Sequence, residues 1–404
     1  MVRRRKQDRS LFEVLLPDAD KLWPAWLKRI DTLLEDEAVI DTVVAALEQR
    51  WPQSRRRGRP GTPAEVVLRM LILKHLHDWS FDELEQEVRA NLVYRAFTRI
   101  GVDAVPDAKT ILKIANALGP EVLTDLHQRI VDVAKRAGVT RGRRFRIDTT
   151  VVETDVHYPT DSTLLQDGVR VLTREMRKAE AAVPPTRPVR DRRRSVGRLG
   201  WAIRRQARSP KTRDAMVHSY RRVIAATRAT LRDVRTTLRR TGQQLRTATS
   251  AAAAVLRRAR QRLTTMRPLI ERVVAQTHAR LIGGDTHVPD KVLSLFEPHT
   301  EAIRKGKIAT PTEFGKMVTI QESEHQIMTA FAVHDHRPAD TTLWVPALER
   351  HGQIFGRAPD LATGDRDFTS AHNERAAEAL GVRRVVLPAQ GRKSPARRAH
   401  ERQR

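Results

Sequence analysis

The 404-residue chain is long for a single core and suggests two or three domains, and its 40% hydrophobic residues are enough to build them. No run approaches the roughly 18 uninterrupted apolar residues of a membrane helix, and the start, MVRRRKQDRS, lacks the apolar stretch of a signal peptide. The absence of cysteine excludes disulfides and thiolate zinc sites, which leaves carboxylates or histidine for any metal. We expect a cytoplasmic protein with no membrane partner.

The net charge of +27 is concentrated in one stretch. Residues 165–285 hold 30 Lys or Arg against 8 Asp or Glu, which is +22 of the total. Such a block repels itself unless a polyanion lies along it, and counterion release from DNA or RNA is the usual compensation. A solvated helix face is the alternative, but Arg outnumbers Lys 28 to 2 and arginine suits phosphate. The expected DNA-binding residues are Arg192, Arg193, Arg194, Arg204, Arg205, Arg221, Arg222, Arg239, Arg240, Arg257 and Arg258.

Residues 1–140 are predicted to form an all-helical domain. The segment TPAEVVLRMLILKHLHDW, from residue 62, places Pro63 at a first-turn position before apolar residues at helical spacing. Ser80 and Glu83 are a predicted capping box at the start of the next helix. Asp107 is the predicted cap of a third helix, and Pro120 stands in the first turn of a fourth, which ends at Gly138. These short helices are compatible with a helix-turn-helix DNA reader and equally with a plain bundle.

A basic segment precedes the first of these helices. In SRRRGRPGTP, residues 54–63, the run Arg57-Gly58-Arg59-Pro60 could lie extended in an AT-rich minor groove. A basic linker between two helical segments explains the same residues, and the sequence favours this second interpretation.

Residues 141–163 combine a predicted strand with an acidic cluster. Along RFRIDTTVV, alternation places Phe145 and Ile147 on one face of the strand, and Arg146 and Asp148 on the other. Asp148 is therefore the one acid that the strand itself orients. The other acids of the cluster lie beyond the strand and are expected to cap or orient the following loop: Glu153, Asp155 and Asp161.

Residues 164–290 are predicted to be an Arg-rich helical insertion. Apolar positions recur every seven residues as Val217, Ile224, Leu231, Leu238, Leu245 and Ala252, with Tyr220, Thr227, Val234, Thr241, Ala248 and Val255 three places later. After a four-residue phase shift the register resumes as Leu256, Leu263 and Ile270. Long helices follow, which Gly242 and Pro268 could bend. The seam closes either as an intramolecular hairpin or between chains.

Residues 291–404 return to short β-prone runs and helices. FGKMVTIQES and QIMTAFAVHDH predict a hairpin, followed by a helix (TTLWVPALERHGQIFG), a strand (PDLATGD), a helix (SAHNERAAEALG) and a strand (RRVVLP). With RFRIDTTVV in front, the fold class is α+β: a mixed sheet with helices, split by the basic block.

Two aspartates stand at strand ends. Asp148 follows RFRI, and Asp365 falls where LATGD leaves its strand. If the two strands lie side by side, both carboxylates project from one edge and can hold Mg²⁺ or Mn²⁺, hard cations that clamp the oxygens of a phosphodiester. Alternatively, Asp148 caps a turn and Asp365 caps the helix beginning near Ser370.

Three groups of residues resemble bacterial insertion-sequence transposases of the DDE class. IDTTVVET with HYPTDS is similar to their first catalytic motif, GKIATPTEFGKMVTIQE and GDRDFTSAHNE to their second-strand and second-aspartate segments, and VVLRMLILKHLHDWSFDELEQEV with VPDAKTI to their amino-terminal region. The resemblance spans nearly the whole chain. It implies an RNase H-like core interrupted after its first strand, divalent metal, DNA strand transfer, and Asp148 and Asp365 as the first two catalytic acids. Asp367 departs from the glycine expected after the Asp-Arg pair.

The third acid of the family is a glutamate on a helix beyond the last strand. Glu401 lies 36 positions after Asp365, a spacing seen in other DDE enzymes, but it stands in a charged tail with no assured helix around it. We therefore expect that the chain is truncated before the true glutamate and that its catalysis is impaired.

The resulting prediction is a transposase that acts on transposon-end and target DNA, as a homo-oligomer, in the bacterial cytoplasm and nucleoid. One rival is a non-catalytic DNA-binding remnant, or an inhibitor of full-length transposase. Another is a two-metal nuclease unrelated to transposition.

Overall fold

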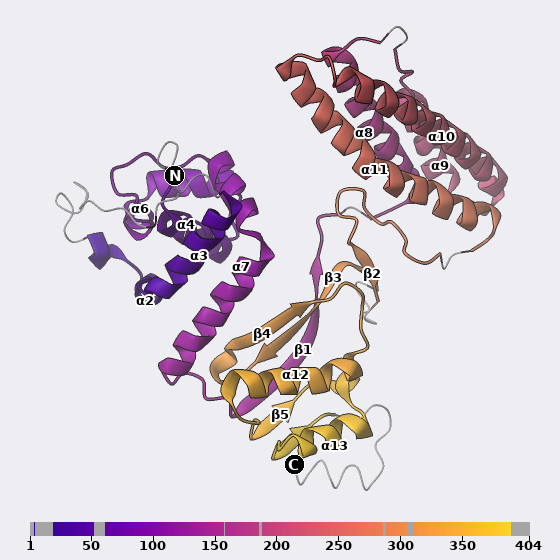
Figure 1. Cartoon of the computed structure of the whole chain (residues 1–404). Coiled ribbons are helices and arrows are strands. Elements are labelled where there is room, and N and C mark those ends of the chain that lie inside the picture. Colours follow the sequence, from indigo (N-terminus) through magenta and orange to yellow (C-terminus); the bar gives the residue numbers. More distant parts are fainter. Residues whose placement is uncertain are drawn as a thin grey trace. The chain divides into compact units, whose positions relative to one another are not determined.

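The computed structural model describes residues 4, 19–51, 61–156, 158–185, 188–285, 288–304 and 311–388. Arg57-Gly58-Arg59-Pro60 and Glu401 lie outside these residues. Contacts divide the chain into two compact units (Figure 1): Met1–Asp148 with Ile320–Ala332 and Ala339–Arg404, and Thr149–Thr319 with Val333–Pro338. Within the described ranges, no helix is long and apolar enough to span a membrane.

In the amino-terminal part of the first unit, the described residues up to Arg136 form helices and no strand. After a 3-10 turn (Ala19–Leu22) its helices are α2 (Ala25–Leu34), α3 (Glu37–Arg50), α4 (Ala64–His77), α5 (Phe81–Ala90), α6 (Leu92–Phe97) and α7 (Ala108–Arg136). The capping box of Ser80 and Glu83 forms at the start of α5. α7 consists of two segments that meet at Gly119, whose φ of +76° suits glycine. These are the two helices that the sequence predicted on either side of Pro120.

A buried ion-pair network ties three of these helices together. Arg69 on α4 is 1% exposed, and its guanidinium contacts Asp31 on α2 at 2.5 Å and Glu65 at 3.0 Å. It also donates to the carbonyl oxygen of Phe97 on α6 at 3.2 Å. Arg99 contacts the same Asp31 at 2.8 Å. The Nε and Nη1 groups of Arg69 are therefore engaged inside the apolar core.

The six strands form one mixed sheet, in the order β2-β3-β1-β5-β6 with β4 paired to β3. They are β1 (Arg144–Glu153), β2 (Glu301–Ile303), β3 (Glu313–Glu322), β4 (Met328–Val333), β5 (Leu361–Thr363) and β6 (Arg384–Val386). Helices α12 (Asp340–Phe355) and α13 (Ala371–Ala379) complete this part. The predicted order of strands and helices is confirmed, and the short strand β2 is an addition to it. The fold class is mixed α+β.

One face of β1 is packed against α12. Phe145 and Ile147 are each 1% exposed and share a core with Trp344 of α12 and with Ala362 and Phe368. The rings of Phe145 and Trp344 meet edge-on at 5.8 Å. The neighbouring residues on β1 are exposed, as the predicted alternation requires.

The Arg-rich insertion is a four-helix bundle within one chain. It consists of α8 (Asp161–Ala182), α9 (Arg193–Gln206), α10 (Arg213–Gln244) and α11 (Ser250–Ile282), with a 3-10 turn at Pro210–Thr212. The predicted seam is buried at Ile224, Leu231, Leu263 and Ile270. Val255 is 38% exposed and does not belong to it. The seam thus closes within one chain, which is one of the two alternatives that the sequence left open.

Candidate active site

Asp148 lies inside β1, on the face opposite the core. Its side chain is 55% exposed, and Nη2 of Arg146 lies 3.9 Å from its Oδ2. The same guanidinium is 3.7 Å from Glu322 on the neighbouring strand β3. Since Asp148 is in the middle of a strand, the alternative that it caps a turn is wrong.

The register of β1 and β5 brings the two predicted aspartates to corresponding positions. The strands are parallel, and the last paired residues are Arg146 and Thr363. Asp148 and Asp365 each follow their strand's paired residue by two positions. Asp148 lies in the middle of β1 and Asp365 follows the end of β5, so the register places the two residues at corresponding positions along neighbouring strands.

The turn that carries Asp365 is tightly built. Asp365 is exposed and caps a 3-10 turn (Arg366–Phe368), where its Oδ1 accepts from the backbone N–H of Asp367 at 2.9 Å. A side chain at Gly364 would stand 3.2 Å from Ile147, Phe368 and Trp344. The small residue before Asp365 therefore lets β5 end close against the core. Helix α13 is capped by Ser370 and not by Asp365.

The donor set fits a hard divalent cation that shares its ligands with substrate. In the described part of the chain, no three His, Asp or Glu side chains gather as a metal cluster. Mg²⁺ is commonly held by one or two carboxylates, with waters and substrate phosphates completing the octahedron. Asp148 on β1 and Asp365 after β5 are exposed carboxylates, and Asp365 has engaged one oxygen in its cap.

Glu324 fixes the beginning of β1, a role that the sequence did not indicate. Its carboxylate accepts hydrogen bonds from the backbone N–H of Arg143 at 2.6 Å and from those of Arg141 and Gly142 at 3.2 Å each. The hydroxyls of Thr140 and Ser323 also donate to it. This acid joins the β3–β4 turn to the strand that carries Asp148.

These hydrogen bonds change the acidity of Glu324. Burial by itself raises its pKa, but the hydrogen bonds from Ser323, Thr140 and Arg143 outweigh burial and lower the pKa from 4.5 to about 2. The stability that the carboxylate contributes is therefore fully present above about pH 4.5. It is lost as the pH falls toward 2.

Glu324→Gln is expected to lower the free energy of unfolding at pH 7 by about 1–3 kcal/mol, because it replaces a charged acceptor of several N–H groups. The difference from wild type should shrink below pH 4.5 and vanish near pH 2, measured by denaturant titration at each pH. The exposed Glu349→Gln on α12 is the control, with little change. A difference that stays constant down to pH 2 would show that this carboxylate is not the titrating group.

Of the other acids in the cluster, Glu153 is the last residue of β1 and does not lie beyond it, and Asp161 is the first residue of α8, which Thr160 caps. Asp161 at the start of α8 contacts Arg280 of α11 at 2.6 Å and accepts from Gln276 at 3.1 Å. It thus joins the first and last helices of the bundle. Glu153 and Asp155 are exposed.

The predicted DNA-binding arginines fall into three groups. Arg192 contacts Asp233 at 2.5 Å and Arg193 contacts Asp191 at 2.7 Å, so both have protein partners. Arg240 is half-buried. The other eight are exposed on the bundle: Arg194, Arg204, Arg205, Arg221, Arg222, Arg239, Arg257 and Arg258.

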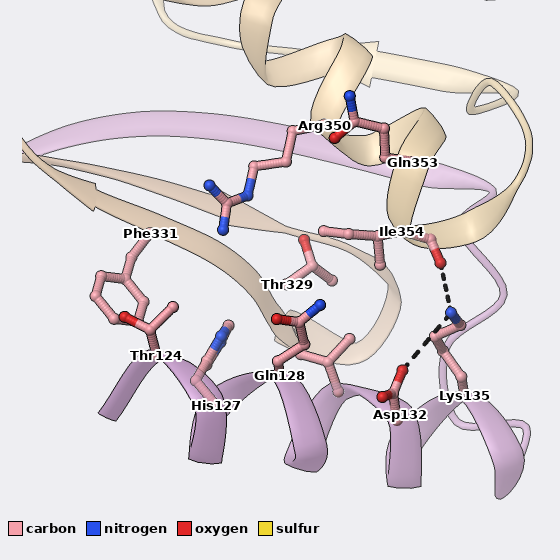
Figure 2. Close-up of a pocket in the computed structure, with 11 residues that line it drawn as sticks. Thr124, His127, Gln128, Asp132, Lys135, Thr329, Phe331, Arg350, Gln353 and Ile354 are labelled. Atoms are coloured by element: carbon pink, nitrogen blue, oxygen red, sulfur yellow. Dashed lines mark hydrogen bonds and ion pairs between the residues drawn. The ribbon is translucent and has the colours of Figure 1, made fainter. Parts of the chain in front are cut away.

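A separate cavity of about 350 Å³ lies in the first unit among α7, β4 and α12 (Figure 2). His127 of α7 donates to the carbonyl oxygen of Met328 at 2.9 Å, and burial lowers its pKa. Lys135 donates to the carbonyl oxygen of Ile354 and lies 3.8 Å from Asp132. None of the predicted site residues lines this cavity.

Comparison with known proteins gives a partial match. Residues 15–117 match a family described as Transposase domain (DUF772). Over 127 residues the chain is 29% identical to a Rhizobium meliloti protein described as "Uncharacterized protein ORF8 in nfe locus", covering 30% of this chain and 61% of that protein. The chain thus spans less than two thirds of that relative's length. No solved structure matches. The sequence of the amino-terminal helices is therefore similar to a transposase domain.

Proposed function

We propose that the chain is a DNA transposase of the DDE class, in which Asp148 and Asp365 are two catalytic acids on an RNase H-like sheet. The observation that carries the proposal is the parallel register of β1 and β5, in which both aspartates stand two residues past the pair Arg146 and Thr363. The transposase-domain match of residues 15–117 supports the proposal independently of the register, because the matched residues come before the sheet in the chain.

The proposed reaction is phosphodiester cleavage followed by strand transfer. Asp148 and Asp365 would hold Mg²⁺ or Mn²⁺, which neutralises charge on the phosphate and activates the attacking oxygen when bound. Arg146 stands beside Asp148 with its side chain 61% exposed, so its guanidinium can move from Glu322 to a phosphate oxygen. Glu324 keeps the strand in place through backbone contacts.

DNA is the proposed partner, at transposon ends and at the target, in the cytoplasm and nucleoid of a bacterium. The exposed arginines of the bundle supply the positive charge for binding DNA phosphates. The carboxylates of Asp148 and Asp365 cannot supply it. A homo-oligomer on DNA is part of the proposal, since cutting two transposon ends and joining both requires two active sites.

Metal binding tests this proposal before any DNA substrate is known. Calorimetric titration of the full chain with Mn²⁺ should show a weak site that Asp148→Asn and Asp365→Asn each remove. Glu153→Gln, an exposed acid further along β1, should leave the site intact. Equal Mn²⁺ binding by wild type and both aspartate variants would return these residues to structural roles. It would leave a DNA-binding protein without metal chemistry as the function.

A further inference from the structure

Helix α9 carries a row of basic residues around a single tryptophan. Four members lie within the helix and the last in the turn that follows, at successive spacings of four, three, four and three residues: Arg194, Arg198, Trp201, Arg205 and Arg208. We call these residues the α9 stripe. At 100° per residue this spacing keeps them on one face. The buried residues Val196, Gly200 and Ile203 occupy the opposite face.

Trp201 is exposed where most large aromatic residues of the chain are not. Its relative exposure is 57%, against 8% for Trp23 and 0% for Trp344. The guanidinium of Arg205 lies 5.0 Å from its ring centroid. Leaving an indole ring in water costs free energy in proportion to the apolar area that stays exposed. An exposed aromatic beside stacked arginine is the arrangement that proteins use to receive a nucleic-acid base.

Along α9 itself, which lies wholly within the described residues, the stripe has no acidic neighbour. No Asp or Glu occurs between Arg193 and Gln206. The acids close to the start of the helix are engaged elsewhere, because Asp191 pairs with Arg193 and Asp233 pairs with Arg192. The four arginines of the stripe are therefore exposed, and no acid on their own helix compensates their charge.

The length and composition of the stripe favour a nucleic-acid strand over a membrane. From Arg194 to Arg208 it spans about 21 Å at 1.5 Å per residue, which is long enough to contact several phosphates of one strand. Insertion into a lipid surface needs a broad apolar face. On α9 that face is buried in the bundle, and Trp201 is the one apolar residue among the five of the stripe.

We propose that the α9 stripe binds single-stranded DNA, with an unpaired base stacked on Trp201 and the flanking phosphates on the arginines. The inference rests on the proposed function, because strand cleavage and joining release strand ends from the duplex. It assigns a different part of the chain to a different step: Asp148 and Asp365 act on the phosphodiester, while the stripe holds an opened strand.

The test measures binding of the full chain to a fluorescent oligothymidylate in EDTA, so that no metal chemistry contributes. Trp201→Ala should weaken binding by about 5- to 150-fold, the range found for loss of one base–aromatic stack. Trp201→Phe should retain most of the affinity, because phenylalanine keeps a π face. An oligonucleotide of the same length with abasic sites keeps the phosphates but not the bases, and its weaker binding should be equal for wild type and Trp201→Ala.

The controls separate stacking from folding and from the catalytic proposal. Trp26→Ala, at a 40% exposed tryptophan outside the bundle, should bind the oligothymidylate as wild type does. Asp148→Asn should also bind normally. Unchanged oligothymidylate binding by Trp201→Ala would overturn the inference, as would an equal loss on the abasic strand. Trp201-dependent binding to anionic vesicles without binding to oligothymidylate would overturn it in favour of a membrane. None of these results depends on metal-dependent cleavage, which tests the proposed function alone.

Discussion

Asp148→Asn is expected to lower metal-dependent cleavage and joining of DNA by about 10³-fold or more. Loss of a metal-holding carboxylate removes several kcal/mol of charge stabilisation from the transition state, and each 1.36 kcal/mol is a factor of ten in rate. Asp365→Asn should cause a loss of the same order. The double variant should be little worse than either single one, because residues that act as a unit are not additive.

The measurement is Mn²⁺-dependent nicking and strand transfer on the DNA that flanks the gene. Glu153→Gln is the matched control on the same strand, since it is exposed and lies beyond the paired segment of β1 and β5. It should retain near wild-type rates. All variants should bind the DNA. Cleavage that survives in both aspartate variants would mean that other residues carry the chemistry.

Arg69→Met is expected to destabilise the amino-terminal helices by about 3–5 kcal/mol. The substitution removes the guanidinium that Asp31 and Glu65 share in the core and leaves them with Arg99, at 2.8 and 3.9 Å; loss of a buried charge partner is costly. The carbonyl of Phe97 loses a donor as well. Denaturant titration followed by tryptophan fluorescence reports this region, because the Arg99 guanidinium lies 5.9 Å from the Trp23 ring.

The matched control for Arg69 is Arg89→Met on α5. Arg89 contacts Glu85 four residues earlier at 2.7 Å, but its side chain is 63% exposed. An exposed pair of this kind contributes about 0–1 kcal/mol. Equal effects of the two substitutions would show that burial of the Arg69 network does not raise its contribution.

Local patterns predicted most elements because their signals are short-range. Alternation along RFRIDTTVV gave the buried face of β1, and helical spacing with Ser80 and Glu83 gave the start of α5. The phase shift that the sequence places between Ala252 and Leu256 falls inside the continuous helix α11 and not at the turn between the two long helices. The chain turns between Gln244 and Ser250, and Pro268 lies inside α11 without ending it.

Long-range partners were less accessible to sequence reasoning. The prediction placed Asp148 and Asp365 at strand ends, yet only the register of β1 and β5 relates one position to the other. The role of Glu324 could not be predicted, because its hydrogen-bond donors are backbone N–H groups about 180 residues away. Such groups carry no sequence signature. β2 has three residues, too few for a period to be visible. The pairing of Arg192 with Asp233 likewise depends on how the bundle packs.

The contacts of Asp161 have a consequence for the order in which the chain folds. Thr154, directly after β1, donates a hydrogen bond to the carbonyl oxygen of Phe314 on β3, which lies 160 residues later in the sequence. Once the bundle has formed, Asp161 and Arg280 are held together, and the loop left to close shortens to roughly 40 residues, which lowers its entropic cost by about 1.2 kcal/mol. Helices with local contacts also form faster than distant strand pairs. The bundle can therefore assemble first, once α11 has been synthesised. Its formation then brings β3 close to β1, the strand that lies beside it in the sheet.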